Sequence, residues 1–136
     1  MKGRKPETVT AGSHPITTVP TPPTWLSKDA KAEWRRVAPV LVERGVLTIA
    51  DLGTLEGFCV AQGLIRSCQR VRDTEGDFYT APTGPKRHPA VTTQDAALKT
   101  ARLFAAELGL TPYARSRTAI AGDGIREASD TDDLGL

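Results

Sequence analysis

The stretch that decides the fold is residues 52–65, which read LGTLEGFCVAQGLI. Glu56 is the only charged residue in it, and apolar side chains fall on more than one side of the helix that it predicts. A helix that is apolar nearly all round has to be buried nearly all round. The rest of the fold must therefore cover this helix.

Two other long helices are expected, one on each side of it in the chain. The first begins after Ser27, a suitable N-cap, and continues to about Arg44, where Gly45 provides the stop. Pro39 predicts a bend within it. The other begins at Thr92 or Thr93. Their apolar faces are formed by Leu26, Ala30, Trp34, Val37 and Leu41, and by Ala97, Leu98, Ala101, Phe104, Ala105 and Leu108.

The charge-poor helix has its own start signal and is followed by a turn-rich segment. Thr48 with Asp51 three residues later resembles a capping box, and we expect the helix to end near Arg72. Residues 73–89 place Gly and Pro around Phe78 and Tyr79, which predicts a small hairpin or loop. These two aromatic side chains could stack on a base or pack the loop onto a helix.

Residues 107–117, ELGLTPYARSR, predict a helix stop, a hinge and a second helix start. Gly109 suits the left-handed residue after a helix end, Thr111 can cap the next helix, and Pro112 fits its first position. Arg115 and Arg117 would project from this short helix. The segment is either an ordinary helical corner or a docking point.

The predicted fold is mainly α, with a core of three long helices, a short C-terminal helix and the hairpin or loop insertion. Residues 1–24 form a flexible basic, Pro-rich arm, residues 25–121 the helical core and oligomerisation domain, and residues 122–136 an acidic flexible tail. Because only two other long helices are available, we expect neighbouring subunits to cover part of residues 52–65. A compact monomer that buries this helix internally is the alternative.

Charge is distributed unevenly along the chain, although the formal net charge is only +2. The arm carries Lys2, Arg4 and Lys5, whereas residues 122–136 carry five acidic side chains and one arginine. This distribution suits contact with nucleic acid at one place and with a basic protein surface at another. Charged ends that only aid solubility are the alternative.

Basic side chains also gather within the body. Lys28, Lys31 and Arg35 share one face of the first helix, which is either a phosphate-binding stripe or an ordinary solvated face. Lys86 and Arg87 lie beside the aromatic pair of the loop and form a second tier of candidate DNA contacts.

The usual signatures of catalysis are missing from the sequence. It holds no Walker-type glycine loop, its two histidines have no partners at ligand spacing, and its carboxylates are scattered. Cys59 and Cys68 point to opposite sides of one helix, which predicts buried, reduced thiols. No apolar run suits a signal sequence or a membrane span. We expect a cytoplasmic non-enzyme without metal or cofactor.

Several short motifs occur in a characteristic order and spacing, although no single one is specific. They are Gly3-Arg4-Lys5-Pro6, Pro23-Thr24-Trp25-Leu26-Ser27 followed by Trp34, Gly45-Val46-Leu47-Thr48 followed by Asp51, Phe58-Cys59, His88-Pro89, and residues 107–117. On these motifs the chain resembles the phage terminase small-subunit family, over nearly all of its length except the last fifteen or so residues.

The resemblance implies a ring of about eight to ten subunits, with a nonamer favoured. Such a ring would bind the packaging-initiation region of double-stranded phage DNA in the host bacterial cytoplasm and would recruit and regulate the large subunit, which supplies ATPase and nuclease activities. We expect DNA contacts at Lys2, Arg4, Lys5, Lys28, Lys31 and Arg35, with Lys86 and Arg87 as the second tier. Subunit contacts are expected at Leu55, Phe58, Cys59, Ile65, Arg115 and Arg117, and large-subunit contacts at Asp130, Asp132 and Asp133.

Two other classes of protein stay open at this point. One is a helix-turn-helix-like dimeric DNA-binding regulator, for which residues 45–48 could supply the turn, although no compact pair of short helices surrounds it. The other is a ring-forming structural component of a virion without sequence-specific DNA binding.

Overall fold

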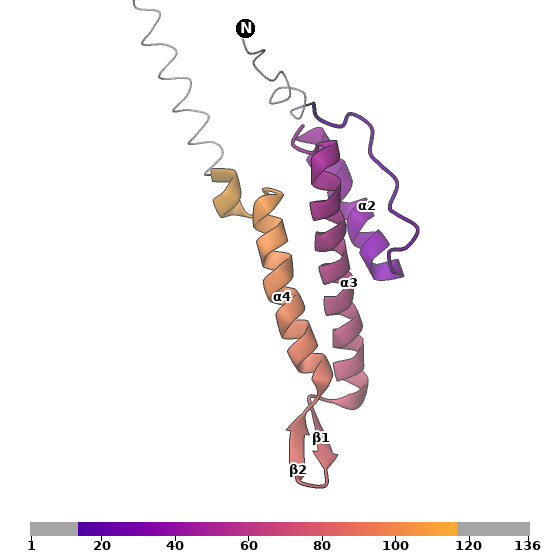
Figure 1. Ribbon diagram of the computed structural model, residues 1–136, viewed down its shortest axis with the longest axis vertical. Helices are drawn as coiled ribbons and strands as arrows, with labels where there is room; N and C mark the ends of the chain where they lie inside the picture. The colour runs from indigo at the N-terminus through magenta and orange to yellow at the C-terminus, as the bar shows by residue number, and fades with distance from the viewer. Residues whose placement is uncertain (1–13, 117–136) are drawn as a thin grey trace, which may run out of the picture.

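The computed structural model describes residues 14–116. Its elements are α2 (Lys28–Glu43), η1 (Ile49–Asp51), α3 (Leu52–Glu75), β1 (Phe78–Ala81), β2 (Gly84–Arg87) and α4 (Pro89–Glu107), in that order. Residues 112–116 form one further helical turn. Figure 1 shows α3 with α4 on one side and α2 on the other, and the hairpin β1–β2 beyond the lower ends of α3 and α4. The prediction of a mainly α fold with a hairpin is confirmed.

Helix α2 begins and ends where its capping residues predict. The hydroxyl of Ser27 accepts a hydrogen bond from the Ala30 N–H, and Gly45 takes the left-handed conformation with φ of 67°. The helix continues through Pro39. All five residues of its predicted apolar face are buried, and so is Glu33, which the apolar pattern did not predict.

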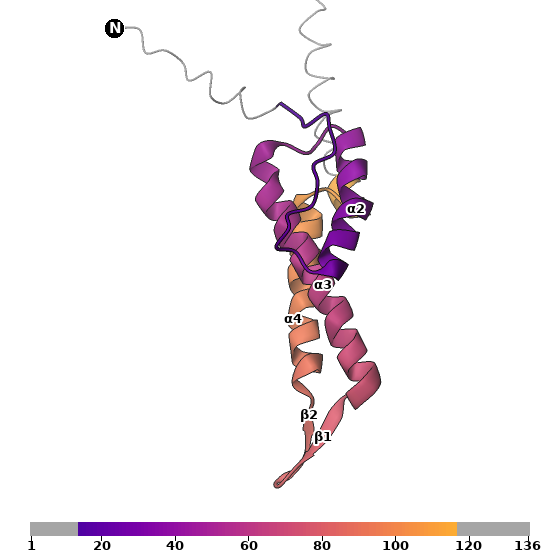
Figure 2. The ribbon, with the colours of Figure 1, turned by 90° about the vertical axis from the view of Figure 1, so that its right-hand side faces the viewer.

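Residues 14–24 lie against the body. The Ile16 N–H donates to the Leu47 carbonyl over 2.7 Å, and the Trp34 indole N–H donates to the Pro20 carbonyl over 2.8 Å. Figures 1 and 2 show this segment running alongside α2 before the chain enters the helix. Two hydrogen bonds and the packing of Ile16 thus connect residues 14–24 with the helices, and the boundary of the arm at residue 24 stays a prediction.

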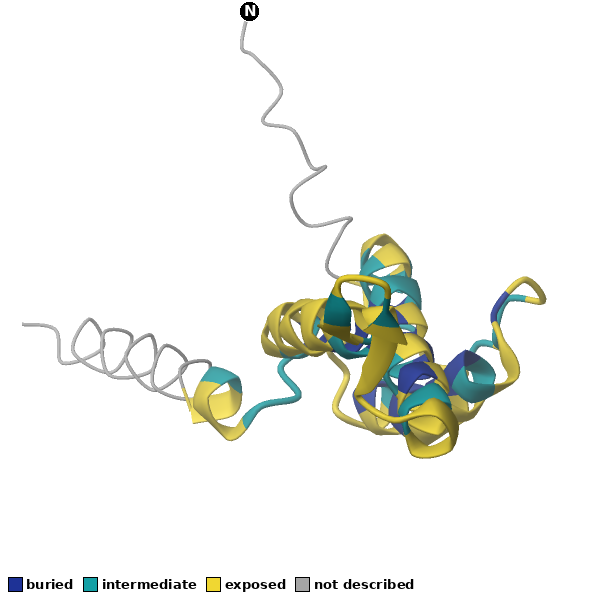
Figure 3. Cartoon of the chain, turned by 90° about the horizontal axis from the view of Figure 1, so that it is seen from below, coloured by how far each residue is buried: buried dark blue, intermediate teal, exposed yellow. Residues whose placement is uncertain are grey.

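Helix α3 is covered largely within the single chain. Leu55, Phe58 and Cys59 are buried against residues of α2 and α4, and the buried faces of the helices meet in the interior (Figure 3). These three side chains are thus covered within the single chain, and a contact through them with a neighbouring subunit stays a prediction. Burial, with a smaller effect from Glu33, raises the pKa of the Cys59 thiol to about 12, so it stays protonated.

The capping box before α3 is confirmed, since Thr48 and Asp51 bond each other reciprocally around the short helix η1. Helix α4 begins earlier than predicted. His88 is its N-cap, with Nδ1 accepting from the Ala90 N–H, and Pro89 occupies the first helical position, to which its fixed φ is suited. Leu98 was predicted in the apolar face of α4 but is half exposed.

The helical corner after α4 has the predicted conformation over its described residues. Gly109 has φ of 69°, and the Leu110 N–H donates to the Ala105 carbonyl over 2.8 Å, which closes the end of α4. The hydroxyl of Thr111 accepts from the Ala114 N–H over 3.1 Å and caps the next turn. Arg115 lies on that turn, and Arg117 lies outside the described residues.

Candidate nucleic-acid interface

The basic stripe of α2, which consists of Lys28, Lys31 and Arg35, keeps its charges available. Lys28 and Arg35 are exposed and Lys31 is half-buried. Within residues 14–116, none of the three takes part in an ion pair. The spacing of three and seven residues places them on one side of the helix. The stripe is thus a row of cations that can bind phosphate.

Other arginines near the α2–α3 contact are already paired. The side chain of Glu33 is only 1% exposed and accepts hydrogen bonds from both Arg36 of α2 and Arg66 of α3. The two guanidinium groups compensate the cost of burying this carboxylate. Sequence reasoning missed the cluster because Glu33 and Arg66 lie 33 positions apart, although the Glu33–Arg36 spacing was a weak signal.

A second pair joins the same two helices one turn away. Arg70 of α3 donates to both carboxylate oxygens of Asp29 of α2, and these hydrogen bonds hold the pKa of Asp29 below its ordinary value. Since Asp29 pairs with Arg70 and Glu33 with Arg66, α2 and α3 run antiparallel along their length. Arg66 and Arg70 therefore serve the helix contact, and this distinguishes them from the unpaired stripe.

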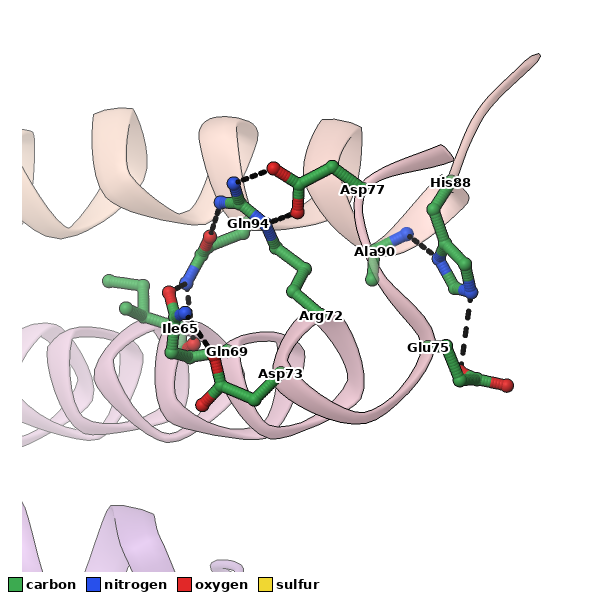
Figure 4. Close-up of polar contacts among 9 residues, drawn as sticks. All are labelled: Ile65, Gln69, Arg72, Asp73, Glu75, Asp77, His88, Ala90 and Gln94. Atoms are coloured by element: carbon green, nitrogen blue, oxygen red, sulfur yellow. Dashed lines mark hydrogen bonds and ion pairs between the residues drawn. The ribbon is translucent and has the colours of Figure 1, made fainter. Parts of the chain in front are cut away.

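The base of the hairpin is held by a polar network between α3 and α4 (Figure 4). The buried amide of Gln94 donates to the Ile65 carbonyl and to the Gln69 side chain, each over 3.0 Å, and its oxygen accepts from Arg72. Arg72 also forms a bidentate pair with Asp77, which lowers the pKa of that carboxyl. The network thus anchors the hairpin to the helices.

The hairpin carries the second-tier candidates. Lys86 and Arg87 of β2 are exposed and lie opposite Tyr79 and Phe78 of β1, respectively. Both aromatic side chains are also exposed, so neither packs the hairpin onto a helix. Tyr79 makes an edge contact with His88, whose Nε2 lies 3.2 Å from Glu75. Because successive residues of a strand point to opposite faces, the hairpin presents one cation beside one aromatic ring on each of its two faces.

The remaining predicted contacts lie outside the described residues. These are Lys2, Arg4 and Lys5 of the arm, Arg117, and the acidic residues Asp130, Asp132 and Asp133. Within residues 14–116, no cluster of three or more His, Cys, Asp or Glu side chains could hold a metal ion. In the same range, no helix has both the length and the apolar composition needed to cross a bilayer.

A second basic surface, which the sequence did not predict, is a cleft between the three helices and the corner. We name it the arginine cleft after Arg36, Arg44, Arg102 and Arg115, which line it. Its volume is about 580 Å³, and its floor is apolar. The four arginines come from α2, from the residue after it, from α4 and from the corner, so no sequence spacing could have united them.

An apolar groove lies on a different face of α3 and α4. It has a volume of about 570 Å³ and is lined by uncharged residues only, among them Val60 and Leu64, which are 40% and 41% exposed. Ile65, one of the predicted subunit contacts, is half-buried and lines the arginine cleft instead. The exposed apolar surface of α3 is thus the groove.

Comparison with known proteins gives one result. A family model described as "Phage terminase, small subunit" matches residues 30–124, which include α2 from Ala30 onward and all of α3, the hairpin and α4. Comparisons with curated proteins and with solved structures give no match. Since the family model matches more than half of the chain, the chain belongs to the phage terminase small-subunit family.

Proposed function

We propose that this chain is the DNA-recognition subunit of a phage packaging motor. It binds double-stranded phage DNA at the packaging-initiation region and recruits the large subunit, which carries out ATP hydrolysis and cutting. Membership of the small-subunit family supports a role in phage DNA packaging. The family is generally a non-catalytic recognition component, and such a subunit works in the host cytoplasm, where the phage genome is packaged.

The observation that carries DNA binding is the difference between two sets of cations on neighbouring helices. Arg66 and Arg70 are occupied by buried or half-buried carboxylates, whereas Lys28, Lys31 and Arg35 of the basic stripe form no ion pair within residues 14–116. An unpaired cation can exchange its counterion for a phosphate without first breaking a protein contact. The stripe is the primary surface in the body, and Lys2, Arg4 and Lys5 of the arm extend it.

The salt dependence of DNA binding tests this surface. The logarithm of the DNA-binding constant falls linearly with the logarithm of the salt concentration, and each lost phosphate contact makes this slope shallower by about 0.9. The triple variant Lys28→Gln, Lys31→Gln, Arg35→Gln should therefore lower the slope by about 2 to 3. The matched control is Lys99→Gln on α4, whose cation is paired with Asp95, and it should leave the slope unchanged.

Neutralising Lys86 and Arg87 shows whether the hairpin or the stripe contributes more phosphate contacts to DNA binding. We expect Lys86→Gln, Arg87→Gln to lower the slope by less than the triple variant does, since the hairpin is the second-tier surface. A triple variant that keeps the wild-type slope would rule out the stripe as a DNA surface, and a larger loss in the hairpin variant would reverse the ranking.

We further propose that the chain assembles into a ring, with a nonamer favoured, through the apolar groove. Leu55, Phe58 and Cys59 are covered within the chain, so the exposed apolar surface left on α3 is the groove with Val60 and Leu64. Its lining carries no charge, so a second copy meets no electrostatic repulsion there. Covering exposed apolar area by another copy stabilises the assembly.

Native mass spectrometry at two protein concentrations tests the ring. We expect a closed assembly for the wild-type chain and its dissociation by Leu64→Asp, which places a charge in the groove. Val46→Asp, at a similarly exposed residue outside the groove, is the matched control and should leave the assembly intact. A wild-type monomer or dimer would contradict the ring and would favour a dimeric regulator.

We assign Asp130, Asp132 and Asp133 to the contact with the large subunit. Five carboxylates in residues 122–136 suit a basic partner surface. Replacing these three by Asn should reduce stimulation of the large subunit, and normal stimulation by that variant would contradict the assignment.

A further inference from the structure

The arginine cleft concentrates positive charge over an apolar floor. Arg36, Arg44, Arg102 and Arg115 line it, and no acidic side chain does. Arg36 shares Glu33 with Arg66, whereas the other three have no ion pair within residues 14–116. Three guanidinium groups without an acidic partner around one cleft favour an anionic ligand.

The chemistry of the cleft suits an anionic ligand that also carries apolar side chains. A guanidinium group binds a carboxylate through two parallel hydrogen bonds. The floor includes Val37, Phe58 and Leu98, which would leave apolar area exposed beneath a purely polar ligand. A peptide segment that contains both acidic and apolar residues satisfies both parts of the cleft.

The same chain contains such a segment. Residues 122–136 read GDGIREASDTDDLGL, with five carboxylates against one arginine, and with Ile125, Leu134 and Leu136 as apolar side chains. Arg115, which lines the cleft, is only seven positions before Gly122. An extended chain advances by about 3.3 to 3.6 Å per residue, so the acidic segment can reach every part of the cleft.

We propose that residues 122–136 bind the arginine cleft of their own chain. The short connection gives the segment a high effective concentration at the cleft, so weak individual ion pairs suffice for occupancy. Bound in this way, the segment neutralises the second basic surface of the body. A basic partner that binds the segment more tightly releases the cleft, so occupancy of the cleft reports whether such a partner is bound.

Paramagnetic broadening in the full-length chain tests the contact. Both cysteines of the sequence are buried, so a Ser129→Cys variant adds one thiol within the segment for a nitroxide label. With isotope-labelled methyl groups, Val40 and Leu98 report on the cleft, and Val60 and Leu64 report on the groove in the same sample. We expect the two cleft residues to lose most of their signal intensity and the two groove residues to keep theirs.

Two full-length variants establish the cause. In one, the tail acids are neutralised as Asp123→Asn, Glu127→Gln, Asp130→Asn, Asp132→Asn and Asp133→Asn. In the other, the cleft is neutralised as Arg44→Gln, Arg102→Gln and Arg115→Gln. Each should restore the Val40 and Leu98 signals, as should added salt, because the contact is electrostatic. Unchanged broadening in both variants, or equal broadening of cleft and groove, would overturn the proposal.

A mixed assembly distinguishes a chain's own tail from a neighbour's tail. Nitroxide-labelled chains without isotopes and isotope-labelled chains without nitroxide are unfolded in urea, mixed and refolded together, so that both kinds enter the same assembly. No broadening in the mixture supports binding within one chain, whereas strong broadening would overturn it in favour of a neighbour's tail. A third outcome would assign the cleft to DNA and overturn the proposal. In it, the labelled tail does not broaden the Val40 and Leu98 signals, and the cleft variant shows a shallower salt dependence of DNA binding. The proposal does not rest on DNA binding by the stripe, so either can fail alone.

Discussion

The carboxylate of Glu33 on α2 lies against the guanidinium of Arg66 on α3, with Oε2 3.0 Å from Nη2. Glu33 is buried and Arg66 is 42% exposed, so the pair sits at the edge of the core with Arg36 closing its other side. This geometry makes Glu33 the polar centre of the α2–α3 contact, since a buried carboxylate is tolerated only when it is paired.

Glu33→Gln should lower the free energy of unfolding by about 2 kcal/mol, because it removes the charge that Arg36 and Arg66 share while it keeps the side-chain size. The estimate is below the range for fully buried pairs, since both arginines are partly exposed. Urea unfolding at fixed protein concentration measures it. The control is Glu43→Gln at the exposed end of α2, and an equal effect of both variants would contradict the role of Glu33.

Gly63→Ala should destabilise the protein by about 1 to 2 kcal/mol through overpacking. An added Cβ at this residue of α3 would lie 3.0 Å from the Ser27 hydroxyl and 3.1 Å from the Ala30 nitrogen, where α2 begins. Gly53→Ala in the same helix meets no atom within 4 Å and should stabilise by about 0.5 kcal/mol through helix propensity. Thermal unfolding measures the change in melting temperature of each variant. A change in the same direction for both would contradict the close approach of α2 and α3.

Gln94→Leu should destabilise the α3–α4 contact by about 1 to 2 kcal/mol, because it leaves the Ile65 carbonyl without its side-chain donor and removes the acceptor for Arg72. Hydrogen exchange should show faster exchange for amides of the hairpin and of the adjacent helix ends. Gln69→Ala removes only one exposed partner of the same network and should cost less than half as much. Unaltered exchange in the hairpin of the Gln94 variant would show that the network does not anchor it.

Acid should weaken the fold partly through Asp29 and Asp77. Hydrogen bonds from Arg70 and Arg72 lower their pKa values below 3.8, so each folded carboxylate holds its proton less tightly than the unfolded one. Their contribution is therefore fully present above the unfolded pKa and is lost as the pH falls through the folded pKa. The urea midpoint of Asp29→Asn, Asp77→Asn should fall less steeply than that of the wild-type chain between about pH 5 and pH 2. If the urea midpoints of the variant and of the wild-type chain fell equally steeply with pH, the two carboxylates would not contribute to acid sensitivity.

Local signals predicted most element boundaries. Ser27, Gly45, the Thr48–Asp51 box and Gly109 all act at the positions that their chemistry predicts, because a cap depends on atoms within three or four residues. The start of α4 was wrong by three or four residues, since a threonine cap was preferred to His88 followed by Pro89. His88 caps through a ring nitrogen, which the common preferences do not include.

The candidate sites were predicted less completely than the helices, because many of their residues are far apart in the sequence. The stripe of Lys28, Lys31 and Arg35 follows from helical spacing alone, so the sequence revealed it. The arginine cleft and the Glu33–Arg66 pair depend on which helix lies beside which, and their members are separated by many residues. Spacing rules do not apply over such separations, so neither was found.

The sequence by itself determined that residues 52–65 form a helix requiring burial, because their apolar periodicity and lack of charge leave no other favourable state. Only the tertiary structure decided what buries it. The close approach of α2 at Gly63 and of α4 at Gly57, where side chains are absent, lets two helices cover Leu55, Phe58 and Cys59 within one chain. That outcome depends on packing in three dimensions, and it moves the surface proposed for a second copy from these residues to the apolar groove.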